Sequence, residues 1–180
     1  MKSENLFPAR LLGFGFYWAW LFLVGVSPSP VMGLVTYEGV PFEAVELAFR
    51  LLAILAIVAL ARPLASNAGR RILLLACMVL GPVATVLLLV ADGAAGIGAT
   101  ALPACVDAAT FMLWLCFFGH MKVGETALYV ALSYAAGALL CLVVMNMESG
   151  AASACAAVLP VLSGCSFLLS NRFYAQQTGS

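Results

Sequence analysis

Three charged residues stand inside long apolar stretches of the sequence: Glu46, Arg50 and Asp107. Glu46 precedes Arg50 by four positions, which is the favourable order for an ion pair along a helix. Asp107 has no residue of opposite charge three or four positions away. A carboxylate in an apolar medium has to be paired or protonated. These residue types predict ion-pair chemistry at Glu46 and Arg50, and proton or ligand chemistry at Asp107.

Other chemistry has little support in the sequence. The chain has a single histidine and six cysteines, none of them spaced as CxxC. It contains no HExxH motif and no apolar segment that combines serine with histidine or pairs two aspartates. We therefore expect no enzymatic activity, no metal and no cofactor, and we interpret the cysteines as small packing residues.

The composition indicates which elements position the three charges. Hydrophobic residues make up 64% of the 180 residues and charged residues 9%, with a mean hydropathy of +1.10. Soluble domains are about 45–50% apolar and about 25% charged. One core of a domain this size cannot hide so much apolar surface from water. The sequence predicts an integral membrane protein.

Six apolar segments are long enough to cross a bilayer, for which a helix needs about 20 residues. Since backbone groups in lipid must bond to each other, each segment is predicted to be a helix. We expect an all-α bundle of six transmembrane helices forming one domain, 1–180. The predicted spans are residues 6–26, 42–61, 72–90, 97–118, 126–145 and 151–169, with a cytoplasmic tail at 170–180.

The charges between the spans predict the orientation of the bundle. Apart from Arg50, basic residues fall only in alternate connections and towards the two ends of the chain: Lys2, Arg10, Arg62, Arg70, Arg71, Lys122 and Arg172. The other connections hold Glu38, Asp92 and Glu148. Basic loops stay in the cytoplasm, so both termini are predicted to lie inside, as an even number of spans requires.

Arg50 and Asp107 are predicted to lie at similar depths. Only residues 51–61 separate Arg50 from Arg62, about 17 Å of helix. This is too short to span, so Arg50 lies below the outer surface. Both residues follow the outer ends of their spans by similar distances, which predicts an interhelical ion pair. Three interpretations stay open: a lock between helices, a protonatable or ligand-contacting site, or side chains that reach water separately.

Aromatic residues and repeated motifs provide further candidates. Phe16, Trp20 and Trp114 are candidate walls of an apolar ligand pocket, with an interfacial belt or helix packing as alternatives. WLFLVG at 20–25 is echoed by WLCFFG at 114–119, and VLGPV at 79–83 by VLPV at 158–161. Such echoes between the first three and the last three spans are typical of inverted repeats in transporters.

The stretch RPLASNAGRR, residues 62–71, resembles the loop motif between the second and third helices of the major facilitator superfamily, roughly G-x-L-x-D-R-x-G-R-R. Four residues match it: Leu64, Gly69, Arg70 and Arg71. Arg62, Ser66 and Asn67 depart from it. The resemblance implies the amino-terminal six-helix half of a facilitator. In that family the aspartate that Ser66 replaces takes part in a charge relay, so the resemblance leaves active alternating access in doubt.

The start of the chain, LLGFGFYWAWLFLVGVSPSPV, is similar to the membrane region of LuxR-type helix-turn-helix regulators of Eggerthella-group actinobacteria. That resemblance implies a multi-pass protein of the bacterial cytoplasmic (inner) membrane with a role in transcription regulation. Residues 170–180 leave no room for a helix-turn-helix domain, and the chain lacks a basic surface for DNA. We therefore expect no direct nucleic-acid binding by this chain.

Together these observations favour a membrane-embedded sensory or signalling module that binds a small, apolar or weakly charged ligand. The alternative is a half-size small-molecule transporter that works as a homodimer or with a missing carboxy-terminal half. A scaffold without a ligand is a third interpretation. The expected partners are the lipid bilayer, a small-molecule ligand, and either a second copy of the chain or a missing carboxy-terminal half.

Overall fold

A computed structural model describes residues 7–25, 36–37, 40–59, 66–90 and 93–178. These residues form six helices and one pair of two-residue strands. The elements are α1 (Phe7–Gly25), β1 (Thr36–Tyr37), β2 (Val40–Pro41), α2 (Phe42–Ala59), α4 (Asn67–Val90), α5 (Gly93–Phe118), α6 (Val123–Met145) and α7 (Ser149–Thr178). The strands pair antiparallel, with Thr36 opposite Pro41.

Four helices are long and apolar enough to cross a membrane: α4, α5 from Gly98, α6, and α7 as far as Ser170. Helices α1 and α2 are shorter, at 19 and 18 residues. The outward sides of the helices carry large apolar side chains, among them Leu55, Ile72, Val79, Leu139 and Val158. Water would strongly disfavour so much exposed apolar surface, whereas lipid accepts it. The prediction of a helical membrane protein is confirmed at this level.

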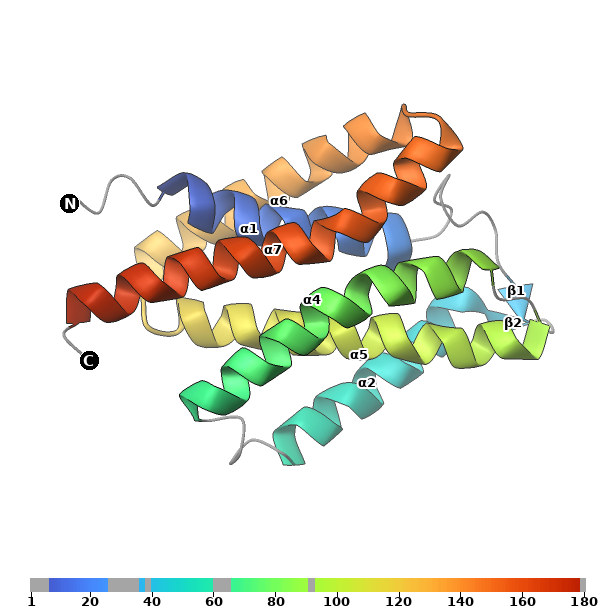
Figure 1. Cartoon of the computed structure of the whole chain (residues 1–180), viewed down its shortest axis with the longest axis horizontal. Coiled ribbons are helices and arrows are strands. Elements are labelled where there is room, and N and C mark those ends of the chain that lie inside the picture. Colours follow the sequence, from blue (N-terminus) through green and yellow to red (C-terminus); the bar gives the residue numbers. More distant parts are fainter. Residues whose placement is uncertain (1–6, 26–35, 38–39, 60–65, 91–92, 179–180) are drawn as a thin grey trace.

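The helices lie roughly side by side and form two groups. In one group, α1 packs between α6 and α7; in the other, α5 packs between α2 and α4. The contact between α4 and α7 joins the groups, and α1 also touches α5 (Figure 1). The core therefore lies among α1, α4, α5 and α7, each of which packs extensively on two other helices.

The ends of the bundle differ in charge. Helix α1 begins and α7 ends at one end of the bundle, where α4 and α6 also begin (Figure 1). Arg70, Arg71 and Lys122 lie there, while Glu148 lies at the junction of α6 and α7 at the other end. Lys2, Arg62, Glu38 and Asp92 lie outside the described residues. Glu125, in the first turn of α6, lies at the basic end as well.

The packing of the helices repeats itself. The contacts of α1 with α6 and α7 correspond to those of α5 with α2 and α4. Within this pattern, the tryptophan of each repeated WL motif is bonded to a hydroxyl that lies just after the repeated proline motif. Trp20 Nε1 donates a hydrogen bond of 3.0 Å to Thr85 Oγ1, and Trp114 Nε1 donates one of 3.2 Å to Ser163 Oγ. Each hydroxyl follows a proline, Pro82 or Pro160, by three positions. We call residues 1–90 and 93–178 the two halves of the chain. In each half, the first helix (α1 or α5) is bonded to the third helix (α4 or α7) by equivalent side chains.

Small residues allow the helix backbones to approach closely. A Cβ atom on Gly137 of α6 would lie 2.6 Å from Trp18 Cβ and 2.8 Å from the backbone oxygen of Gly15 on α1. A Cβ on Gly81 of α4 would lie 2.5 Å from Pro160 Cβ on α7. Close backbone packing of this kind drives helix association in lipid, where the hydrophobic effect between helices is absent.

Two predicted boundaries need correction. The stretch 62–71 was expected to be a loop, but α4 begins at Asn67, so Gly69, Arg70 and Arg71 are helical. Ser66 caps this helix, because its Oγ accepts a hydrogen bond of 3.0 Å from Gly69 N. At the other end of the chain, α7 continues to Thr178 through most of the predicted tail.

Candidate functional site: a buried polar network

Four polar side chains from three helices meet in the middle of the bundle: Tyr17 of α1, Glu46 and Arg50 of α2, and Asp107 of α5. Tyr17, Arg50 and Asp107 each lie near the midpoint of their helix. We call this group the polar network.

The predicted pair between Arg50 and Asp107 is confirmed. Arg50 Nε lies 2.6 Å from Asp107 Oδ2. Arg50 Nε has no hydrogen-bond partner among the described residues, so this contact acts through charge rather than through an aligned hydrogen bond. The Arg50 guanidinium also donates a hydrogen bond from Nη2 to Glu46 Oε1, at 2.5 Å. One guanidinium therefore holds a carboxylate of its own helix and one of α5.

Tyr17 completes the network and was not predicted. Its hydroxyl donates a hydrogen bond of 2.5 Å to Asp107 Oδ1. Both oxygens of the Asp107 carboxylate are thus engaged, one by α1 and one by α2. Tyr17 lies in an aromatic cluster that covers its helix on all sides, so residue type alone did not single it out. Its depth, halfway along the first span and level with Asp107, can be estimated from the sequence, but the side of α1 that faces Asp107 cannot.

The charges of the network do not balance. It contains two carboxyl groups and one guanidinium, so with both acids ionised it carries one excess negative charge. Charges in a medium of low dielectric interact strongly and lose their hydration, which makes an uncompensated charge costly. Tyr17 and Asp107 are only 3% exposed.

Arg50 is the member of the network that reaches the surface of the bundle. Its side chain is 27% exposed, against 5% for that of Asp107. A guanidinium at the middle of a membrane faces protein or water rather than lipid, because lipid offers it no hydrogen-bond acceptor. Arg50 is therefore the member of the network that a polar group outside the bundle can reach most easily.

The aromatic residues predicted to line a ligand pocket are not part of the polar network. Trp20 and Trp114 are 2% and 1% exposed, and both use their indole N–H groups within the bundle. Phe16 packs against the apolar core around Trp20. These three residues contribute to helix packing, one of the alternatives left open by the sequence, and none of them lines the groove described next.

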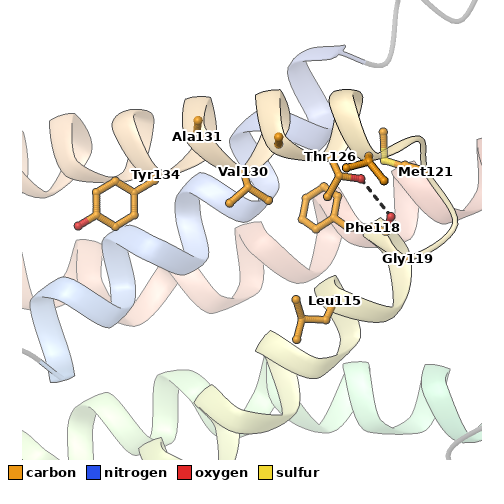
Figure 2. A pocket seen from close by; sticks show the side chains of 10 residues that line it. Leu115, Phe118, Gly119, Met121, Thr126, Val130, Ala131 and Tyr134 are labelled. Carbon is orange, nitrogen blue, oxygen red and sulfur yellow. Dashed lines mark hydrogen bonds between the residues drawn. The ribbon is translucent and has the colours of Figure 1, made fainter.

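An apolar groove of about 880 Å3 runs along the outside of the bundle between the end of α5 and the first half of α6 (Figure 2). Sequence reasoning did not find it, because small residues on two helices create it together. Its lining consists of Leu115, Phe118, Gly119, Met121, Val123, Thr126, Ala127, Val130, Ala131 and Tyr134. Thr126 Oγ1 is already used in a hydrogen bond of 3.2 Å to the Phe118 carbonyl oxygen.

The facilitator-like motif is separate from both sites. Gly69, Arg70 and Arg71 lie in the first turns of α4 at the basic end of the bundle, and Leu64 lies outside the described residues. Within the described part of the chain, no group of three or more His, Cys, Asp and Glu side chains is placed to hold a metal ion. Comparison of the chain with family models, curated proteins and solved structures finds no match.

Proposed function

We propose that this chain is a membrane-embedded sensory module of a bacterial cytoplasmic membrane, with six spans and both termini inside. In this proposal it is built like the amino-terminal half of a facilitator. Binding of a small, weakly charged ligand shifts the bundle between two packings. A cytoplasmic partner reads the shift, as the resemblance to LuxR-type regulators implies.

The polar network is the observation that carries the proposal. Tyr17, Arg50 and Asp107 join three helices through side chains that a ligand can compete for. A ligand changes a conformational equilibrium only through different interactions with the two states. A ligand that takes over the contact of Arg50 with Asp107 releases α2 from α5, whereas one that adds a positive charge beside Glu46 tightens the same contact. Either event changes the helix packing.

Ser66 supports sensing over active transport. It stands where the facilitator motif has an aspartate, and its hydroxyl caps α4 by accepting the hydrogen bond from Gly69 N. A serine keeps the cap but supplies no charge for a gating relay. The amino end of α4 is then a fixed basic surface, with Arg70 and Arg71 available to an output partner.

A half-size transporter is the second candidate, and the internal repeat favours it. The Trp20–Thr85 and Trp114–Ser163 bonds occupy equivalent places in two sets of three helices. Repeats of this kind form transporters in which the halves rock around a central site. In this second proposal, two copies of the chain or a partner half complete the site on the side of α2 that carries Arg50.

Binding and flux measured on the same sample separate the two proposals. The full chain is placed in proteoliposomes and screened by thermal shift against small amines, carboxylates and neutral aromatic compounds. The strongest binder is then followed for uptake into the vesicles. A sensor binds without uptake, and Arg50→Gln abolishes the shift, whereas Gly124→Ala, in open space, preserves it. Uptake that depends on Asp107 favours the transporter, and a screen without any shift contradicts both.

A further inference from the structure

The groove between α5 and α6 has the dimensions of one membrane leaflet. On α6 its lining extends from Val123, the first residue of the helix, to Tyr134. These eleven steps correspond to about 17 Å of helix, close to half of the ~30 Å hydrocarbon core. The groove therefore begins at the membrane surface and ends near the middle, as an acyl chain of one leaflet does.

The shape of the groove comes from small side chains between larger ones. The lining combines the small residues Gly119, Ala127 and Ala131 with the larger Leu115, Phe118 and Tyr134. Gly119 lies on the α5 side and Ala131 on α6 (Figure 2). Ala127 and Ala131 are one helical turn apart, so the channel follows the helix axis. Its walls are almost entirely apolar, and its polar Thr126 hydroxyl is already bonded to Phe118 O. An apolar chain fits this lining better than a polar ligand does.

The mouth of the groove carries one exposed lysine. Lys122 is exposed and lies between the lining residues Met121 and Val123. It is the N-cap residue of α6, and no side chain caps that helix end. Its neighbour His120 is exposed as well, and its Nδ1 lies 2.6 Å from the Cys116 carbonyl oxygen. Glu125, in the first turn of α6, is the acidic group nearest in sequence.

From these observations we infer that the groove binds one anionic phospholipid, with an acyl chain along α6 and its phosphate beside Lys122. The inference rests on the membrane location proposed above, but it needs neither a sensory ligand nor flux. A lysine near an anionic membrane surface attracts acidic headgroups, and the apolar channel holds the chain. The lipid so bound packs against the end of α5, the helix that carries Asp107.

Tryptophan fluorescence reports directly on occupancy of the deep end of the groove. The ring of Trp18 on α1 lies 5.1 Å from that of Tyr134, which lines the groove. The full chain is placed in phosphatidylcholine vesicles in which a small fraction is either phosphatidylglycerol or phosphatidylcholine with brominated chains. Bromine quenches indole fluorescence on contact. A Trp18→Phe variant identifies the component of the signal that comes from Trp18.

The expected result is stronger quenching of Trp18 by brominated phosphatidylglycerol than by brominated phosphatidylcholine. The preference should be about fivefold, the contribution of one lysine at an anionic membrane surface. Lys122→Gln should abolish the preference and Lys122→Arg should keep it. Glu125→Gln should increase it, because the carboxylate competes with the lipid phosphate for Lys122.

A pair of alanine variants tests the groove itself. Ala131→Leu fills the channel and should reduce quenching by both lipids, whereas Ala154→Leu, at an exposed position on α7, should not. Equal quenching by the two lipids would overturn the headgroup recognition. Unchanged quenching in Ala131→Leu would overturn the groove as the site. Neither result bears on the sensory proposal, which the thermal-shift and uptake assays test separately.

Discussion

The hydroxyl of Tyr17 donates a hydrogen bond of 2.5 Å to Asp107 Oδ1, joining two residues that are 90 positions apart in the chain. Asp107 contacts Arg50 through its other oxygen. The first helix is therefore connected to α2 through a carboxylate of α5. A change at any one of these three side chains alters how all three helices pack.

Tyr17→Phe tests how much the Tyr17 hydroxyl contributes to the stability of this connection between the helices. The substitution removes one hydrogen bond to a charged acceptor, so the free energy of unfolding should fall by about 1.5–3 kcal/mol. Reversible unfolding in mixed detergent micelles measures it. Tyr134→Phe is the matched control, since Tyr134 is 49% exposed. Removal of its hydroxyl should change the free energy of unfolding by no more than about 0.5 kcal/mol. Equal losses in the two variants would contradict a special role for Tyr17.

Thr85→Val and Ser163→Ala test the two repeated tryptophan bonds. Each variant leaves a buried indole N–H without its acceptor, which should cost about 1–3 kcal/mol. The same unfolding assay should give additive losses in the double variant, to within about 0.5 kcal/mol, because the bonds lie in different halves. Ser153→Ala is the control, since that hydroxyl bonds only to Ser149 O of its own helix. Strong non-additivity would show that the halves are not independent.

Gly137→Ala tests the close approach of α1 and α6. The added methyl group would overlap Trp18 Cβ and the Gly15 carbonyl oxygen, which belong to the neighbouring helix and cannot both retreat. The expected loss of stability is about 1–3 kcal/mol, as for other overpacked interiors. Gly124→Ala, on the same helix, meets no atom within 4 Å and should be neutral or slightly stabilising. Thermal unfolding of both variants under the same conditions measures this difference in stability.

Ser66→Ala tests the cap of α4. Loss of the hydroxyl should destabilise the chain by about 1 kcal/mol. Ser66→Asp should retain stability, because an aspartate caps equally well and its charge suits the amino end of a helix. Melting temperatures of the two variants measure the difference. If both variants melt alike, the hydrogen bond from Gly69 N contributes nothing.

Comparison of the sequence with the structure shows which features were predictable. Arg50 and Asp107 were paired from the sequence, because distance along a span fixes depth and charge at that depth needs a partner. Tyr17 could not be chosen in this way, since the rotation of α1 decides which of its aromatic residues faces Asp107. The groove was missed for the same reason. Gly119 and Ala131 are ordinary small residues until the chain turns from α5 into α6 and places them in one groove.

The charged stretch 62–71 shows a different limit. Arg70 and Arg71 suggested a solvated loop, although Ser66 is an ordinary N-cap residue type for a helix that begins at Asn67. Long basic side chains can reach the membrane surface from the first turns of a helix, so charge alone does not mark where a span begins. The start of α4 is therefore marked by its cap residue, Ser66, and not by the arginines.

The most direct test concerns the ion pair between Arg50 and Asp107 inside the membrane. Arg50→Gln, Asp107→Asn and the double variant form a double-mutant cycle, measured by reversible unfolding in bilayer-like micelles. Arg50→Gln should cost the most, about 3–5 kcal/mol, because it leaves two buried carboxylates without their cation. Asp107→Asn should cost less, since Glu46 still holds the guanidinium. The double variant should lose less than the sum of the two, with a coupling of about 0.5–3 kcal/mol. Fully additive losses would contradict the ion pair.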